Sequence, residues 1–181
     1  SSGYTWINVP IKKGQKSLPI MDVKINNEIP WGKINLKKIC AGYNKAKFFH
    51  LYKDYFENLY KKEWNNIFDL NFETIKQVLR WLDIKVEIVV ESELRVSGQP
   101  TERLVKVCKK LGADTYISGI GGKRYLYEKL FEKNKIIIKY QNYNPIRYLQ
   151  HMSESFIPNL SIIDLLANVG SESGKLLKES N

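Results

Sequence analysis

The chain has 181 residues, with 29 Lys and Arg against 19 Asp and Glu, for a net charge of +10. Hydrophobic residues make up 43% of it and aromatic residues 12%, so it can bury a sizeable core and intrinsic disorder is excluded as its dominant state. No charge-free apolar run approaches about eighteen residues, which excludes a membrane-spanning helix, and the length suits one domain or one domain plus an appendage.

The first third of the chain predicts two short strands followed by helices. Residues 4–12 and 21–25 read as strands, and residues 31–42 as a short helix. Residues 47–62 predict a stronger helix, because apolar residues recur there at helical spacing. We expect this aromatic stripe to be core rather than a stacking platform. It comprises Phe48, Tyr52, Tyr55 and Leu59, widened by Phe49, Phe56 and Tyr60.

The middle of the chain predicts a helix, a strand and a second helix. Asn71 can cap a helix over residues 72–83, and the alternating residues 85–91 read as a strand. Thr101 is a plausible N-cap for a helix over residues 102–111, which Gly112 closes.

The pattern then returns to strands. Residues 114–118 predict a strand and residues 119–122 a glycine turn. The turn leads into a helix over 123–132, and residues 135–140 form an apolar run suited to a buried strand. This alternation from residue 85 onwards indicates parallel βαβ units.

The predicted fold class is α/β, with a parallel-sheet, Rossmann-like βαβ core and an additional helical, aromatic-rich segment. We assign the core to residues 85–170 and treat residues 1–84 as a truncated part of the same fold. Ser161 and Asp164 resemble a capping box that opens a last helix over 162–169. The polar residues 171–181 are expected to form a frayed tail.

The positive charge is concentrated in the first third of the chain. Residues 1–62 hold 12 Lys and 4 acids, whereas residues 63–181 hold 17 Lys and Arg and 15 acids. A basic face attracts phosphates, although a solvated lysine surface explains the same excess. Since no zinc-finger, RNP-type or basic-zipper pattern accompanies it, we predict no sequence-specific nucleic-acid binding.

The best candidate for a binding site is the glycine-rich stretch that follows the strand at 114–118. Its glycines let the backbone approach a ligand closely, and the helix that it opens would offer free N–H groups to a phosphate. Two cations at a helix start are unfavourable without a bound anion. A tight turn with two solvent-facing cations is the plainer alternative. The predicted phosphate-binding residues here are Ser118, Gly119, Gly121, Gly122, Lys123 and Arg124.

A second helix start follows the strand predicted at 85–91 and could line the same crevice. Thr101 and Arg103 could bind a phosphate there, and Glu102 could act as a catalytic base. A simple helix cap with first-turn charges explains these residues equally well.

Other reactive side chains give weaker signals. His151 is a better catalytic candidate than His50, which lies in the aromatic helix. Cys40 and Cys108 have no metal or disulfide spacing, so we predict core thiols, a reducing cytosol and no structural metal.

Several segments together resemble the WbqC-like family of bacterial surface-polysaccharide genes. The resemblance rests on TERL at 101–104, on residues 112–119, 121–126, 140–141 and 156–166, and on Asn168 and Gly170. Relatives also carry an N-terminal segment rich in His, Gln, Pro and aromatic residues, which this sequence lacks. The chain has no initiator Met and reads as strand from Tyr4, so we interpret it as a fragment that starts inside a fold.

The resemblance implies a cytoplasmic bacterial transferase of O-antigen biosynthesis. It would add an acyl or aminoacyl group, such as glycyl, to a nucleotide-linked amino sugar. No cofactor is predicted, and the oligomeric state is left open. Two alternatives stay open: a non-catalytic nucleotide- or anion-binding module in polysaccharide assembly, and a nucleotidyl-transfer or adenylate-forming enzyme.

Overall fold

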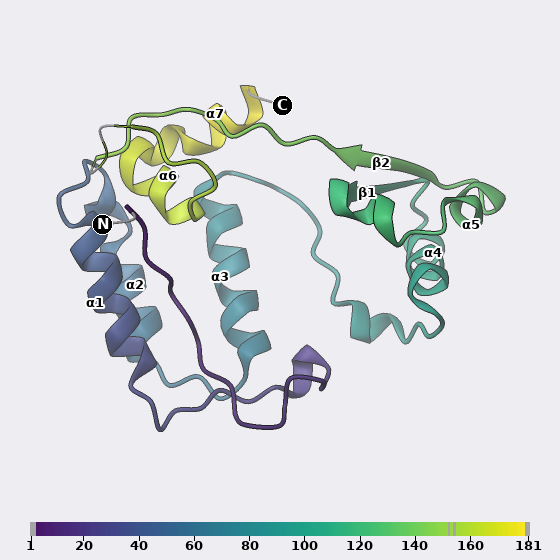
Figure 1. Ribbon diagram of the computed structural model, residues 1–181, viewed down its shortest axis with the longest axis horizontal. Coiled ribbons are helices and arrows are strands. Elements are labelled where there is room, and N and C mark those ends of the chain that lie inside the picture. The colour runs from purple at the N-terminus through teal and green to yellow at the C-terminus, as the bar shows by residue number, and fades with distance from the viewer. Residues whose placement is uncertain (1–2, 152, 154, 180–181) are drawn as a thin grey trace. The chain divides into compact units, whose positions relative to one another are not determined.

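A computed structural model describes residues 3–151, 153 and 155–179. The chain divides into two compact units (Figure 1). Unit 1 consists of residues 1–85 and 145–181, and unit 2 consists of residues 86–144. Unit 1 is therefore built from two separate stretches of the sequence. None of the helices in the described ranges is long and apolar enough to cross a membrane.

Unit 1 is helical. Its helices are α1 (Trp31–Tyr43), α2 (Lys53–Lys61), α3 (Ile67–Trp81), α6 (Ile162–Val169) and α7 (Ser173–Glu179). The predicted helix at 31–42 is confirmed as α1, whereas the one at 47–62 is divided into a 3₁₀ turn at Phe49–Leu51 and α2. Helix α3 starts before the predicted residue 72 because the side chain of Asn66, not Asn71, accepts the N–H of Phe68 at 2.7 Å.

The two strands predicted in unit 1 are wrong. Residues 4–12 and 21–25 contribute only isolated bridges, between Ile11 and Ile25 and between Lys24 and Asn66. The alternating pattern reflects burial of single residues such as Ile25, which is 2% exposed, rather than a ladder.

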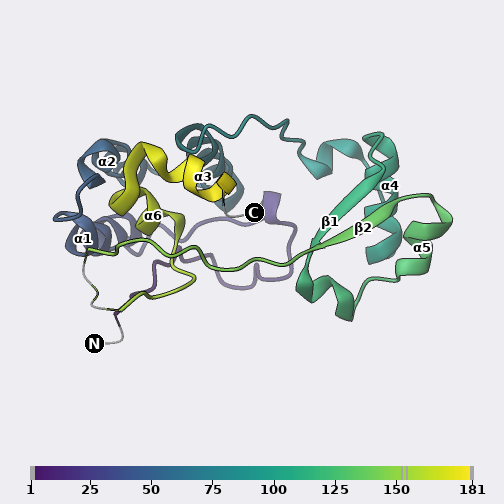
Figure 2. The ribbon, with the colours of Figure 1, turned by 90° about the horizontal axis from the view of Figure 1, so that it is seen from above.

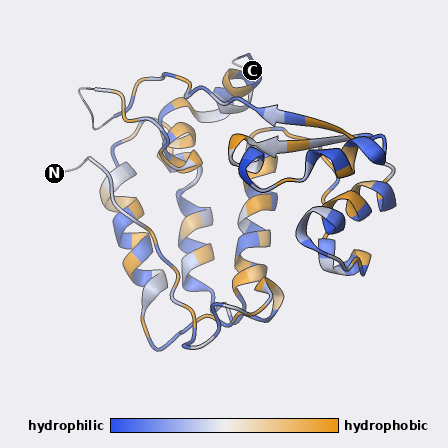
Figure 3. Ribbon diagram, turned by 45° about the vertical axis from the view of Figure 1, so that its right-hand side comes forward, coloured by the Kyte–Doolittle hydropathy of each residue, from blue (hydrophilic) through white to orange (hydrophobic). Residues whose placement is uncertain are grey.

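The core of unit 1 contains the predicted aromatic stripe, so that interpretation is confirmed. Phe49 and Phe56 are buried, and their rings stack with centroids 6.2 Å apart. Trp81 of α3 meets the rings of Tyr52 and Tyr55 edge-on, each at 4.9 Å. Figure 3 shows the resulting pattern, with orange and blue residues alternating along the helices.

Raising the pH above about 10 should destabilise unit 1. Burial raises the pKa of Tyr60 to about 12, and burial with the nearby Glu73 carboxylate raises that of Tyr55 to about 12. The folded unit therefore holds these protons more tightly than the unfolded chain does. The stabilisation that these two protonated tyrosines provide is complete at a pH below their pKa in the unfolded chain. It is lost as the pH rises through their pKa in the folded unit. Urea titrations at about pH 9 and about pH 11.5 measure the difference.

Tyr55→Phe provides the control. The Tyr55 hydroxyl is buried and has no hydrogen-bond partner among the described residues. Removing it should raise the free energy of unfolding at neutral pH by about 1 kcal/mol and make the alkaline decline shallower. An unchanged decline would contradict the role assigned to Tyr55.

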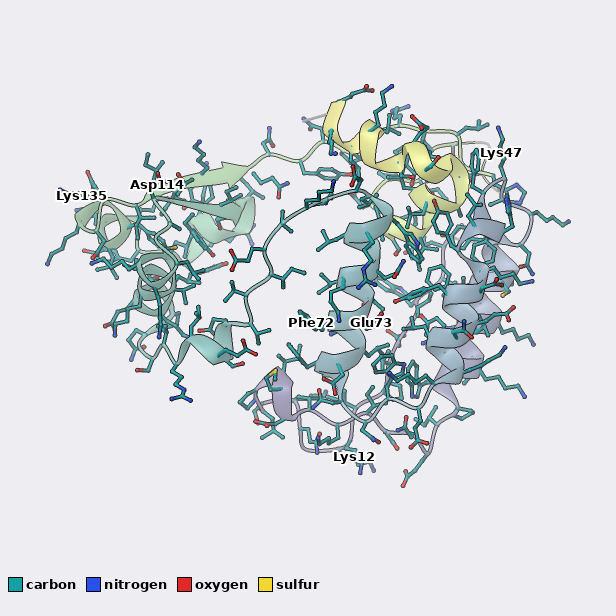
Figure 4. All side chains as sticks on the ribbon, turned by 180° about the vertical axis from the view of Figure 1, so that it is seen from behind. Lys12, Lys47, Phe72, Glu73, Asp114 and Lys135 are labelled. Atoms are coloured by element: carbon teal, nitrogen blue, oxygen red, sulfur yellow. The ribbon has the colours of Figure 1, made fainter. Side chains whose placement is uncertain are left out.

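Unit 2 is a mixed helix and strand unit around a small parallel sheet. It contains α4 (Pro100–Lys110), β1 (Thr115–Gly119), α5 (Glu128–Lys133) and β2 (Ile137–Gln141). Strands β1 and β2 pair in parallel, with Thr115 opposite Ile137 and Gly119 opposite Gln141 (Figure 2). Figure 4 labels Asp114 and Lys135, which precede the two strands. The sequence thus correctly predicts one βαβ unit, formed by β1, α5 and β2.

Four local predictions in unit 2 need correction. The strand predicted at 85–91 is wrong: residues 85–90 pair with no described strand, and Glu91 begins a 3₁₀ turn. An alternating pattern specifies which residues share a face, but it does not specify a neighbouring strand. Helix α4 starts at Pro100 after Gln99, so Thr101 is not its N-cap. The helix predicted at 123–132 begins only at Glu128. Strand β2 is not buried on both faces. Its side chains alternate between exposed and half-buried, and the half-buried ones, Ile138 and Tyr140, pack against the core of unit 2.

The core of unit 2 is centred on Phe131, which is fully buried and stacks on Tyr116 with ring centroids 5.2 Å apart. Cys108 belongs to this core, as predicted, and burial raises the pKa of its thiol. The other buried members are Val105, Leu126 and Ile136.

The C-terminal part of unit 1 is more ordered than the sequence suggests. Ser161 caps α6 as predicted by accepting the N–H of Ile163 at 3.4 Å, and Gly170, with a φ of 73°, ends it. The frayed tail is a wrong prediction for residues 173–179, which form α7 and bury Ser173 and Gly174. Residues 180–181 lie outside the described residues.

Candidate functional site

The glycine turn lies at the carboxyl end of β1, at the position predicted, but it does not open an α-helix. Residues Ile120–Arg124 form a 3₁₀ turn. A side chain at Gly122 would place its Cβ 2.1 Å from Ser118 Oγ, so this close approach requires glycine. The Ser118 hydroxyl donates to the carbonyl of Gly119 at 3.1 Å and is thus used within the turn.

The two cations of the turn differ in their surroundings. Lys123 Nζ lies 5.1 Å from the ring centroid of Tyr140, the β2 residue opposite Ser118. The exposed Arg124 side chain makes no hydrogen bond or ion pair with any residue that the structure describes. Neither cation is neutralised by a described carboxylate, so both are free to attract an anion.

The first turn of α4 contributes one contact to this region. Thr101 Oγ1 accepts the N–H of Tyr127 at 3.3 Å, which joins the start of α4 to the segment after the glycine turn. The structure therefore joins Thr101 to the segment that follows the turn.

Glu102 and Arg103 are already paired with other residues. Glu102 Oε1 lies 2.7 Å from Lys106 Nζ, and the hydrogen bond and charge of Lys106 lower the pKa of Glu102, which makes it a weaker base. Arg103 Nε donates to Glu91 Oε1 at 2.7 Å, and a second bond joins Arg103 Nη2 to Glu91. Hydrogen bonding to Glu91 raises the pKa of Arg103, so any ligand of Arg103 must compete with Glu91.

His151 belongs to unit 1, in a segment held by α6. Its backbone N–H donates to Asn168 Oδ1 at 2.8 Å, and its side chain is exposed. The preceding residue, Gln150, is 8% exposed and binds both the carbonyl of Ile157, at 2.9 Å, and its N–H, at 2.7 Å.

A buried carboxylate lies at the centre of these contacts. Asp164 of α6 is 5% exposed, and its Oδ2 accepts the Tyr148 hydroxyl at 2.7 Å and Gln150 Nε2 at 2.9 Å. Burial and the Asp164 carboxylate raise the pKa of both Tyr43 and Tyr148, so these phenols remain protonated. No Lys, Arg or His in the described ranges forms an ion pair with Asp164.

This cluster is not predicted from the sequence, because Ser161 and Asp164 have the spacing of a capping box. The Asp164 carboxylate instead points into unit 1, and only its backbone N–H meets the carbonyl of Ser161, at 2.8 Å. One signal was available: Asp164 and Asn168 are four residues apart, and therefore share one face of an otherwise apolar helix.

No three His, Cys, Asp or Glu side chains in the described part of the chain are grouped so that they could hold a metal ion.

Comparisons with known proteins place the chain in a family. The model of the WbqC-like protein family matches residues 1–176. The chain is 28% identical over 180 residues to an uncharacterized protein of Mycobacterium tuberculosis, Rv1507c, covering 98% of this chain and 78% of that one. No solved structure matches the chain significantly. Because the family match includes both the glycine turn and the Asp164 cluster, and covers nearly all residues, the chain belongs to the WbqC-like protein family.

Proposed function

We propose that this protein is a transferase of surface-polysaccharide (O-antigen) biosynthesis, which adds an acyl or aminoacyl group to a nucleotide-linked amino sugar. The observation that carries the proposal is the pair of unneutralised cations, Lys123 and Arg124, on the glycine turn. Ligands of parallel α/β sheets bind beyond the carboxyl ends of the strands, where this turn lies. The proposal treats the β1–α5–β2 unit as the ligand-binding part of a Rossmann-like core.

The phosphates of the nucleotide would lie against the turn. Arg124 offers a planar fork of donors that matches two phosphate oxygens, and Lys123 adds a second positive charge. Gly119 and Gly121 have open space on the side where a Cβ would stand, which leaves their backbone accessible to a ligand. The Thr101 hydroxyl accepts the N–H of Tyr127 just after the turn, and its own hydrogen could be donated to a ligand.

The two predicted candidates for taking a proton from the sugar amine are Glu102 and His151. Glu102 would first have to leave Lys106 and has a lowered pKa, which makes it the weaker choice. The acyl or aminoacyl chemistry and a cytoplasmic location in a bacterium are inferred from the family.

Replacing Arg124 with glutamine should weaken the binding of UDP and of UDP-N-acetylglucosamine about 10-fold or more, since a charge-assisted hydrogen bond contributes about 1.5–3 kcal/mol. Isothermal titration calorimetry measures the change. Lys109→Gln is the matched control, because Lys109 lies in the last turn of α4, the end opposite to Thr101. Lys109→Gln should leave the affinity unchanged.

Two results would contradict the phosphate site. One is negligible binding of both ligands by the wild-type protein at millimolar concentration. The other is an equal loss of affinity in Arg124→Gln and Lys109→Gln, which would indicate a general charge effect rather than a defined site.

A further inference from the structure

We propose that the outer face of α1, with the exposed Trp6 beside it, docks on the surface of an anionic lipid bilayer. This basic face consists of Lys33, Ile34, Lys37 and Lys38. All of these residues belong to unit 1, so the inference needs no contact between the two units. It goes beyond the proposed transfer reaction and does not depend on it.

The basic face carries charge of one sign. Residues 29–53 contain six lysines and no Asp or Glu. Lys33 and Lys37 are exposed, and neither side chain forms an ion pair or a hydrogen bond with any residue that the structure describes. Like charges four residues apart on a helix repel each other, and a cation in the first turn opposes the helix dipole. An anionic surface would relieve both effects.

Packing on the other side of α1 keeps the basic face outward. Trp31, Asn35 and Ile39 recur every four residues on that other side, and all three are buried. On the basic face, in contrast, Ile34 is 44% exposed between lysines. An apolar side chain in this position can enter the boundary between headgroups and acyl chains, while the lysines stay among the headgroups.

An exposed tryptophan lies next to the basic face. Trp6 is 72% exposed, and its ring meets that of Tyr4 edge-on with centroids 6.2 Å apart. Lys38 Nζ donates to the carbonyl of Trp6 at 2.8 Å, which holds this segment alongside α1 (Figure 1). Tryptophan and tyrosine are enriched at membrane–water interfaces, because their rings are apolar and carry one polar group. A lysine face with an exposed tryptophan beside it therefore fits a lipid surface.

The composition of this region favours a bilayer over a nucleic acid. None of the first 79 residues is Arg, the residue whose planar fork fits a phosphate in a defined geometry. Lysine acts as a point charge, so a lysine face responds to the negative potential of a lipid leaflet without fixed partners. The exposed Ile34 has no counterpart in a row of phosphates, whereas a bilayer offers it an apolar layer.

Co-sedimentation with vesicles tests the docking. The wild-type protein should bind vesicles made of equal parts of phosphatidylglycerol and phosphatidylcholine, and should not bind vesicles of phosphatidylcholine alone. The double variant Lys33→Gln/Lys37→Gln should bind the anionic vesicles about 10-fold or more weakly. Lys109→Gln/Lys133→Gln is the matched control, because it removes the same charge from exposed positions of unit 2. It should bind as the wild type does, and circular dichroism should show both variants folded.

Tryptophan emission gives a second, independent readout. Trp31 and Trp64 are 5% and 7% exposed and Trp81 is half-buried, so Trp6 is the tryptophan whose surroundings a bilayer would change. Adding the anionic vesicles should shift the emission of the wild-type protein to shorter wavelength. The shift should be absent in Trp6→Phe, which keeps an apolar ring at this position.

Three results would overturn the proposal. The wild-type protein might sediment with neither kind of vesicle, the two double variants might lose affinity equally, or Trp6→Phe might keep the full emission shift. A DNA oligonucleotide serves as the competing polyanion. Binding of that oligonucleotide through Lys33 and Lys37, without binding to vesicles, would assign the basic face to nucleic acid instead.

Discussion

Replacing Phe131 with alanine should lower the free energy of unfolding of unit 2 by about 3–5 kcal/mol, the usual cost of removing a buried phenyl ring. Phe131 is 0% exposed and stacks on Tyr116, and among the described residues four other buried side chains belong to its cluster. A core of this size supplies only a few kcal/mol of net stability, so the substitution should leave unit 2 largely unfolded at room temperature.

Phe49→Ala is the matched substitution in unit 1, where Phe49 is 1% exposed. All four tryptophans, Trp6, Trp31, Trp64 and Trp81, lie in unit 1, so tryptophan fluorescence reports the unfolding of that unit alone. Phe49→Ala should shift the fluorescence transition in urea, whereas Phe131→Ala should abolish slow amide exchange in β1 and β2. Protected strand amides in Phe131→Ala would show that the phenyl ring is not what stabilises the sheet.

Replacing Gly32 with alanine should destabilise unit 1 by about 1–3 kcal/mol, because α1 and α2 meet at this residue. A Cβ at Gly32 would lie 2.5 Å from the backbone oxygen of Tyr60. Backbone cannot move aside as the end of a long side chain can, so the two helices must separate. That separation loosens the contact between Trp31 and Tyr60, whose rings are 6.0 Å apart.

Gly42, in the same helix, gives the control. Beyond its chain neighbours and the backbone of its own helix, no described atom lies within 4 Å of the position that a Cβ would take at Gly42. Gly42→Ala should therefore stabilise the protein by about 0.5–1 kcal/mol through helix propensity. Thermal unfolding monitored by circular dichroism should therefore move in opposite directions for the two variants. Equal shifts would mean that the close crossing at Gly32 has no energetic consequence.

The existence of the helices could be predicted from the sequence more reliably than the existence of the strands, for a physical reason. The apolar stripe of a helix repeats within the helix, and α1 was accordingly predicted to within one residue. A strand needs a neighbouring strand to pair with, and the alternation of apolar residues does not identify that neighbour. Residues 85–91 have the alternation of a strand, yet in the part of the chain that the structure describes only β1 and β2, which flank α5, form a ladder.

In the candidate site, too, local features could be predicted from the sequence and contacts between distant residues could not. The glycine turn after β1 was recognisable because glycines and a preceding strand are local features. The pairing of Arg103 with Glu91 and of Tyr148 with Asp164 depends on side chains 12 and 16 residues apart, and no local rule indicates which of several partners each will take. The Tyr43 hydroxyl comes from a different helix again, α1.

The interrupted course of unit 1 along the sequence has a consequence for biosynthesis. Leu166 and Ala167 of α6, at 1% and 0% exposure, complete the same cluster as Ile25 and Phe49. While a ribosome is still making residues 86–144, the nascent helices α1 to α3 have no α6 to cover them, and their apolar faces are open to chaperones or to aggregation. A unit 2 that folds promptly on emergence shortens the loop that must close before α6 can dock, and so reduces the entropy lost in that step. Slow folding of unit 2 would therefore lower the yield of folded unit 1, although the two units have separate cores.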